Sequence, residues 1–138
     1  MSYTKCGELQ EIIKKKSNPM PRNRDRLYVT SIEVALWATK GKGWTYNRQR
    51  ETYENAIFEY PSVHHSKRIQ PTQKPIELIE DLIKIHSNKG DLIFDPFLGS
   101  GTTAIAAINT GRNYIGIEKE EEYYHKSLER ISDALKAF

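Results

Sequence analysis

The second half of the chain begins with apolar residues at helical spacing. Between Ile76 and Ile85 they lie three or four positions apart, which predicts a helix with one broad buried face. Pro75 suits the first turn of this helix, and Gly90 is typical of a residue that ends one. We therefore expect a helix that begins at Ile76 and ends before Gly90.

A strand, a helix and a second strand are predicted next. Residues 91–95 and 114–117 are short apolar runs, and residues 102–109 between them form a predicted helix of small residues. This order predicts a βαβ unit with parallel strands and a right-handed crossover. A closing amphipathic helix is predicted from Glu120, with apolar residues at Tyr124, Leu128, Ile131 and Leu135.

The first half of the chain is less regular. Residues 9–13 and 29–38 have the composition of strands, and two prolines between them exclude a regular element there. We expect an antiparallel strand pair with a basic loop, residues 14–26, at its tip. Residues 41–73 lack sustained periodicity, which is typical of a functional or mobile segment.

Composition narrows the class of protein. The 138 residues are 38% hydrophobic and 28% charged, which fits one modest globular domain. A single cysteine excludes a disulfide scaffold, and the longest apolar runs, of five residues, are far too short to span a membrane. We expect a cytoplasmic protein that does not associate with membranes.

The charge is divided unevenly between the two halves. Residues 1–75 contain 14 Lys/Arg and 7 Asp/Glu, a net charge of +7, whereas residues 76–138 contain 7 and 11, a net charge of −4. This asymmetry indicates that the first half meets a polyanion. A basic face that is merely solvated is the alternative.

The clearest candidate site is the turn between the predicted strand 91–95 and the predicted helix 102–109. Gly99 and Gly101 let the backbone approach a ligand closely, and the amides that open the helix suit a carboxylate or a phosphate. No Lys-Ser or Lys-Thr follows these glycines, which excludes a Walker A loop. Glu118 lies 17 residues beyond Gly101, close to where nucleotide-binding βαβ units place the acid that binds a ribose.

Together, the glycine turn and this acid predict an adenosyl ligand. Three alternatives stay open at this point. The turn could be purely structural, Glu118 could simply begin the acidic end of the last helix, or the ligand could be the nicotinamide cofactor of an oxidoreductase.

Residues 95–103, Asp-Pro-Phe-Leu-Gly-Ser-Gly-Thr-Thr, resemble the Phe-x-Gly-x-Gly cofactor motif of the DNA amino-methyltransferases. Residues 70–75 resemble the Pro-Thr-x-Lys-Pro segment of the same family, and this order is characteristic of its circularly permuted β group. Residues 16–23 and 33–40 resemble the late strands and DNA-facing loop of adenine-modifying members. The resemblance implies a restriction-modification enzyme that transfers a methyl group from S-adenosylmethionine to adenine N6 in double-stranded DNA, with cytosine N4 as the alternative target.

The resemblance also implies the fold. We expect an α/β protein with a partial Rossmann-like methyltransferase sheet, flanking helices and an N-terminal antiparallel strand pair. In a single domain over 1–138, residues 1–43 would hold the late strands and the basic loop. Residues 44–70 would form a short DNA-facing variable segment, and residues 71–138 the cofactor-binding βαβ part.

Site residues follow from the same resemblance. The turn would surround the methionine and sulfonium end of the cofactor, the acid would hold the ribose, and residues 72–75 would complete the pocket. The predicted cofactor-binding residues are Thr72, Lys74, Pro75, Asp95, Phe97, Gly99, Gly101 and Glu118.

The basic loop is the predicted DNA contact. Residues 14–26 hold six basic residues and one acid, which suits contacts with DNA phosphates that weaken as the salt concentration rises. The predicted DNA-binding residues are Lys16, Arg22, Arg24 and Arg26. No metal is expected, because the adjacent His64 and His65 lack spaced Cys, Asp or Glu partners.

One part of the family's pattern is missing. Members carry a Pro-Pro clamp that holds the flipped target base, since a base stacked in the duplex cannot reach the methyl group. None of the six prolines here is followed by another, so we assign no catalytic residue. We expect the chain alone to bind cofactor weakly or not at all and not to methylate DNA.

Two explanations of the missing clamp compete. The chain could be a subunit whose companion chain supplies the clamp, or a truncated remnant. A homodimer and a non-catalytic DNA- or cofactor-binding accessory module are further alternatives.

Overall fold

The computed structural model describes residues 6–20 and 25–137, and the chain divides into two units, residues 1–62 and 63–138. The mixed α/β character confirms the predicted fold class. The finer division into parts at 1–43, 44–70 and 71–138 stays a prediction.

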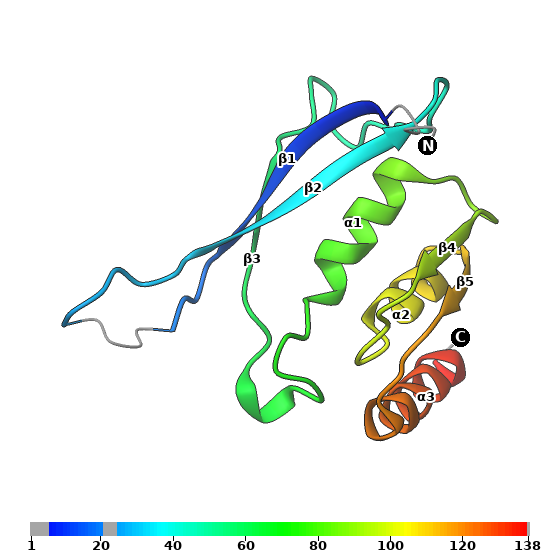
Figure 1. Cartoon of the computed structure of the whole chain (residues 1–138). Coiled ribbons are helices and arrows are strands. Elements are labelled where there is room, and N and C mark those ends of the chain that lie inside the picture. Colours follow the sequence, from blue (N-terminus) through cyan, green and yellow to red (C-terminus); the bar gives the residue numbers. More distant parts are fainter. Residues whose placement is uncertain (1–5, 21–24, 138) are drawn as a thin grey trace, which may run out of the picture. The chain divides into compact units, whose positions relative to one another are not determined.

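The first unit is a three-stranded sheet in the order β2-β1-β3 (Figure 1). β1 (Cys6–Lys16) pairs antiparallel with β2 (Ile32–Lys40), which confirms the predicted strand pair. β3 (Ile57–Tyr60) pairs parallel with β1 and lies inside the segment 41–73 that we expected to be irregular. Its four residues are too few to establish a period in the sequence, so the pattern missed it.

The basic loop begins later in the chain than predicted. β1 continues to Lys16, so residues 14–16 belong to the strand and residues 17–31 connect it to β2. Figure 1 shows the described parts of this connection, residues 17–20 and 25–31, extending beyond the paired strands. Asn18 anchors its beginning, because its Oδ1 accepts a hydrogen bond from the Ser62 amide at 2.6 Å and its Nδ2 donates to the Ser62 carbonyl at 3.2 Å.

The second unit contains the predicted helix and βαβ unit. After the short 3-10 helix η1 (His65–Lys67), its elements are α1 (Ile76–His86), β4 (Leu92–Asp95), α2 (Thr102–Asn109), β5 (Asn113–Gly116) and α3 (Glu121–Lys136). β4 and β5 are parallel, with Leu92 opposite Asn113 and Asp95 opposite Gly116. These elements confirm the order that the apolar pattern predicts.

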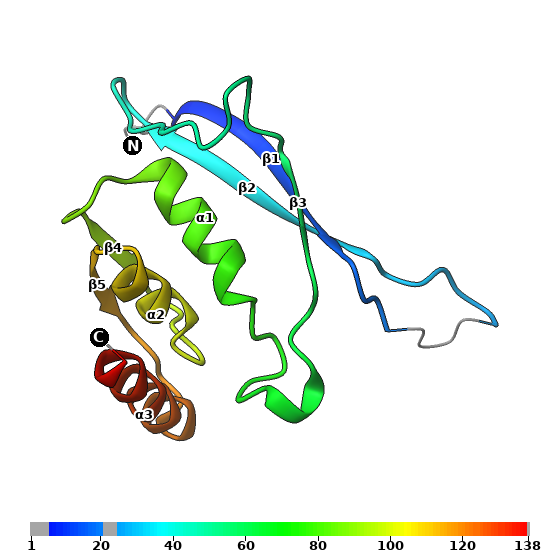
Figure 2. The ribbon, with the colours of Figure 1, turned by 180° about the vertical axis from the view of Figure 1, so that it is seen from behind.

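The core of the second unit is built around α2. Ala104, Ala106 and Ala107 have no exposed surface, and they pack in two clusters with Ile83 of α1 and Ile131 of α3. Figure 2 shows α1 and α2 side by side from behind. Small side chains allow this close approach, and the buried apolar surface stabilises the unit.

α3 is the predicted amphipathic helix, and most of the apolar residues named for it are exposed. Of these four residues only Ile131 is buried, while Tyr124, Leu128 and Leu135 are 44–55% exposed. The face that packs on α2 instead contains Ser127, which is fully buried. A small residue at this position lets the helix approach the turn at Gly101, and this rotates the contact line away from the larger side chains.

One face of the β4–β5 sheet is bare. Ile93 and Tyr114 point toward the core, but the alternating residues on the other face are 51–58% exposed: Leu92, Phe94, Ile115 and Ile117. Parallel sheets are normally covered on both faces. This surface, which we call the bare β4–β5 face, therefore lacks the cover that its composition requires.

Candidate functional site

The turn between β4 and α2 is held to the end of β5 by backbone hydrogen bonds. The Ile117 amide donates to the Asp95 carbonyl at 2.9 Å, and the Leu98 amide donates to the Ile117 carbonyl at 2.8 Å. Asp95 also accepts a hydrogen bond from the Phe97 amide through its Oδ1, at 2.9 Å. The parallel pairing of the two strands thus continues into the turn.

Both glycines of the turn adopt left-handed backbone conformations, with φ of 55° at Gly99 and 79° at Gly101. A Cβ on Gly101 would lie 3.2 Å from the Cβ of Ser127 and 3.4 Å from Ile131. A Cβ on Gly99 would clash with the Oε1 of Gln70. Both positions therefore favour glycine for its conformation, and Gly101 also for the space beside Ser127 and Ile131.

Glu118 lies directly against this turn. Its Oε2 accepts a hydrogen bond from the Gly99 amide at 2.8 Å, and its Oε1 accepts one from the Glu120 amide at 2.9 Å. Chiefly the Glu120 amide, and also the Gly99 amide, lower the pKa of Glu118, so the carboxylate is ionised at neutral pH. The acid and the glycine turn, paired in the sequence by spacing alone, are in contact.

The segment 70–75 reaches the turn through Gln70. The Gln73 amide donates to the Gln70 carbonyl at 3.1 Å, and the Gln73 side chain accepts from the Ile69 amide at 2.9 Å. These bonds fold the segment into a turn before α1. Pro75 is buried at the start of α1, whereas Thr72 and Lys74 are exposed.

Placement of the predicted cofactor-binding residues is thus uneven. The structure brings Gly99, Gly101 and Glu118 together, and Asp95 orders the first part of the same turn. Phe97 is 86% exposed. Assignment of these residues, with Thr72, Lys74 and Pro75, to a cofactor stays a prediction.

Sequence reasoning did not assign a role to two residues at this turn, Gln70 and Arg130. Gln70 covers Gly99, and Arg130 of α3 donates to the Ser100 carbonyl at 2.9 Å. Neither has a spacing signal, because each contact joins segments about thirty residues apart in the chain. For Gln70, its position inside the quoted segment 70–75 was the one available clue.

An open hollow of about 410 Å³ lies on the same unit. It is lined by Arg68, Ile69, Lys126, Glu129, Arg130 and Asp133. None of the predicted cofactor-binding residues lines it, whereas Arg130 both lines the hollow and contacts the glycine turn.

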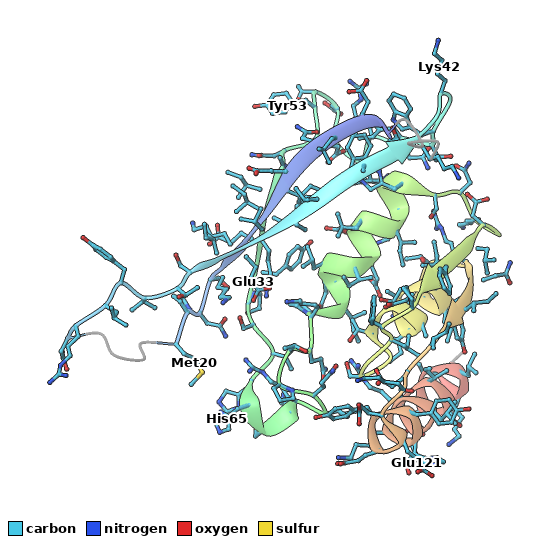
Figure 3. All side chains as sticks on the ribbon, in the orientation of Figure 1. Met20, Glu33, Lys42, Tyr53, His65 and Glu121 are labelled. Atoms are coloured by element: carbon cyan, nitrogen blue, oxygen red, sulfur yellow. The ribbon has the colours of Figure 1, made fainter. Side chains whose placement is uncertain are left out.

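The predicted DNA-binding residues fall in different settings. Lys16 lies in β1, with its Nζ 3.3 Å from a carboxylate oxygen of Glu33, and the buried Lys14 lies 3.8 Å from the same side chain. Arg26 is exposed, in the connection that also carries the exposed Met20 labelled in Figure 3. Arg22 and Arg24 lie outside the described residues, and contact of all four predicted residues with DNA stays a prediction.

Metal-binding clusters and membrane-spanning helices are both absent from residues 6–20 and 25–137. These residues contain no cluster of three His, Cys, Asp or Glu side chains arranged to hold a metal ion. Within the same ranges no helix has the length and apolar character needed to cross a membrane.

Comparison with known proteins gives a consistent result. A family model described as DNA methylase matches residues 5–129. The type II methyltransferase M2.MboI of Moraxella bovis is 37% identical over an alignment of 129 residues, covering 86% of this chain and 47% of that protein. For M2.DpnII of Streptococcus pneumoniae the identity is 33% over 135 residues, covering 89% of this chain and 50% of that protein.

A solved structure agrees in fold. The crystal structure of an M1.HpyAVI-SAM complex matches with a TM-score of 0.79 at 44% identity, covering 88% of this chain and 61% of that one. The chain therefore spans about half the length of the curated relatives that it matches.

Proposed function

Because this chain belongs to the DNA methylase family, we propose that it is the cofactor-binding and DNA-facing part of an S-adenosylmethionine-dependent DNA methyltransferase. The methyl acceptor is the N6 of adenine in double-stranded DNA, and the enzyme serves a restriction-modification system in the cytoplasm. Residues 16–23 and 33–40, which resemble adenine-modifying members, favour adenine over cytosine N4.

The contact between Gly99 and Glu118 carries this proposal. An ionised carboxylate held by two backbone amides keeps lone pairs free to accept hydrogen bonds from the two hydroxyls of a ribose. The two glycines beside it let the backbone of the turn pack closely against Gln70, Ser127 and Ile131, which holds the turn next to the carboxylate. The residues present thus fit S-adenosylmethionine.

When bound, S-adenosylmethionine supplies an activated methyl group. The contribution of this chain is binding and orientation: Glu118 fixes the ribose, and the backbone of the turn fixes the methionine end. No acid or base on the chain is assigned to the reaction, since holding the sulfonium in line with the amine of a flipped base needs mainly geometry.

A companion segment carrying the Pro-Pro clamp completes this enzyme in our proposal. Three observations support it: the chain has no Pro-Pro pair, it matches about half of its relatives, and the bare β4–β5 face is apolar. In the first unit Leu9, Val34 and Leu36 are also 57–70% exposed. Apolar sheet surfaces of this kind are typical of interfaces.

Calorimetry tests the cofactor part of the proposal. The chain is titrated with S-adenosylmethionine and, in parallel, with NAD, alone and after co-expression with a clamp-bearing methylase segment. We expect binding of S-adenosylmethionine and not of NAD, and binding that strengthens in the complex. Preference for NAD, or no S-adenosylmethionine binding in either preparation, contradicts the assignment.

A methylation assay tests the division of labour. Labelled S-adenosylmethionine and adenine-containing duplex DNA are incubated with the single chain, with the companion and with both. We expect labelled N6-methyladenine only with both. Turnover by the single chain contradicts the need for a companion, label on cytosine N4 contradicts the choice of base, and cofactor binding without turnover in any mixture favours a non-catalytic accessory module.

Light scattering on the purified chain distinguishes a companion chain from a second copy of this chain as the partner. A companion interface predicts a monomer or a loose self-association that the companion displaces. A stable dimer that excludes the companion favours the homodimer instead.

A further inference from the structure

We propose that Arg130 is a positioning residue. From α3 it holds the turn between β4 and α2 in the conformation that binds the cofactor. This inference rests on the proposed function, since it concerns the same turn. Nothing in the spacing of the sequence points to Arg130, and the inference comes from its contacts.

Arg130 lies in α3 and reaches the turn with one nitrogen. Its Nη1 donates to the Ser100 carbonyl at 2.9 Å and to Thr102 Oγ1 at 3.1 Å, with Ser100 Oγ at 3.4 Å. Ser100 is 3% exposed and Thr102 6%. The guanidinium therefore holds the residue between the two glycines and the first residue of α2.

The position of Ser100 makes this contact consequential. Gly99 and Gly101, on either side of it, both have positive φ, which is one of several backbone conformations open to an unrestrained glycine. Gly99 is supported on one side by Glu118 and Gly101 on the other by Ser127 and Ile131. Arg130 fixes the carbonyl between them and so completes the set of restraints on the turn.

The charge of Arg130 also matters for a ligand at the turn. None of the ion pairs among the described residues involves Arg130, and its partners at the turn are neutral oxygens. Burial lowers the pKa of Arg130, yet an arginine stays charged at neutral pH. A half-buried positive charge beside the start of α2 favours an anionic group at this turn, such as the carboxylate of the methionine end.

Arg112 provides a matched control in the same unit. It is another half-buried arginine, and its Nη2 donates to the Ser87 carbonyl at 2.7 Å and its Nε to Ser87 Oγ at 3.1 Å. It joins the segment before β5 to the end of α1. Loss of Arg112 removes comparable hydrogen bonds without touching the glycine turn.

The experiment compares Arg130→Gln, Arg130→Lys and Arg112→Gln in the whole chain, with three measurements on each. These are the melting temperature, the hydrogen exchange of the Gly99 and Gly101 amides by NMR, and S-adenosylmethionine affinity in the complex with the companion. We expect similar losses of melting temperature for both Gln variants. Only Arg130→Gln should accelerate exchange at Gly99 and Gly101, by about tenfold, and weaken cofactor binding by a similar factor.

Arg130→Lys keeps the positive charge. We expect it to change the amide exchange and the cofactor affinity less than Arg130→Gln does. The inference is overturned if Arg130→Gln leaves exchange at the two glycines as it is in Arg112→Gln, or if both Gln variants weaken cofactor binding equally. The proposed function fails separately, when the unaltered complex does not bind S-adenosylmethionine at all while the exchange difference persists.

Discussion

Glu118 and Gly99 are joined by a hydrogen bond of 2.8 Å from the Gly99 amide to the Glu118 carboxylate, across 19 residues of sequence. The second oxygen of the same carboxylate accepts from the Glu120 amide at 2.9 Å. This arrangement fixes the acid at the end of β5 against the turn that follows β4. It makes the ionised carboxylate part of the turn's own structure as well as a candidate ligand for ribose.

The pH dependence of this contact follows from the direction in which the fold shifts the pKa of Glu118. The fold lowers the pKa of Glu118, so its stabilising contribution is present above the ordinary pKa of a glutamate, about 4.3, and is lost as the pH falls through the lower folded value. We expect the Gly99 amide to shift in NMR spectra with a midpoint below that ordinary value.

Glu118→Gln is the control for this titration. An amide side chain can still accept a hydrogen bond but does not titrate, so the shift of the Gly99 amide in this pH range should disappear. An unchanged Gly99 titration in the variant would show that another carboxyl group is responsible.

The same variant should weaken S-adenosylmethionine binding by roughly tenfold or more, since hydrogen bonds to a charged acceptor contribute about 1.5–3 kcal/mol.

Gly101→Ala tests the packing behind the turn. Its left-handed backbone costs an alanine about 1–2 kcal/mol, and the added methyl group also crowds Ser127 and Ile131. Gly90→Ala is the control, because Gly90 has a φ of 86° and no atom lies within 4 Å of the point that its Cβ would occupy. Chemical denaturation should show Gly101→Ala to be more destabilising than Gly90→Ala by about 1 kcal/mol or more. Equal losses would show that conformation alone decides.

Much of the second unit was predictable because its signals are local. Apolar spacing identifies α1, and short apolar runs around a glycine turn identify β4, α2 and β5. The contact between Glu118 and the turn was also predictable, since parallel strands bring their carboxyl ends to one edge.

Other features depend on contacts between segments that are distant in the chain. The local pattern of apolar and polar residues does not predict such contacts. β3 is too short to show a period, and its partner β1 lies far from it in the chain. In α3 the small polar residue Ser127 packs inward, and the apolar spacing gives no signal for that. The bond from Arg130 to Ser100 spans 30 residues between polar groups, which carry no hydrophobic periodicity.

Gly116→Ala probes the contact between β5 and the turn. A Cβ at Gly116 would lie 2.7 Å from a methyl group of Leu98, so Leu98 must move. Overpacking of this kind costs about 1–3 kcal/mol. Leu98→Ala removes the obstacle, and the double variant should be more stable than the sum of the two single losses by about 1 kcal/mol in a double-mutant cycle. Strict additivity in denaturant unfolding would contradict the contact.

Arg26→Ala tests the predicted contact of DNA with the connection between β1 and β2. Arg26 is exposed, and a phosphate contact from it would release a counterion on binding. The plot of log affinity for duplex DNA against log salt should lose about one unit of slope, without change in sequence preference. Lys89→Ala, which removes a charge from the exposed turn after α1, should leave the slope unchanged. Equal effects of the two variants would point to nonspecific attraction by net charge.

Phe94 and Ile93 are neighbours in β4 with opposite surroundings. Substitutions at the two positions therefore distinguish a proposed interface residue from a core residue. Phe94 lies on the bare β4–β5 face and is 58% exposed, whereas Ile93 packs against the core. Phe94→Ser should leave the melting temperature of the single chain nearly unchanged, since exposed substitutions usually change stability by no more than about 0.5 kcal/mol. It should, however, reduce binding of an apolar fluorescent dye and co-purification of the proposed clamp-bearing companion.

Ile93→Ser completes this comparison by placing the same polar residue on the other face of the strand. It should lower the melting temperature strongly, because it removes apolar contacts and buries a hydroxyl group. If the bare face only awaits a partner, the two variants have opposite profiles: one loses the complex and keeps the fold, and the other loses the fold. Retention of the companion by Phe94→Ser would mean that the companion covers a different surface, and a large loss of stability in the single chain would mean that Phe94 already belongs to its core.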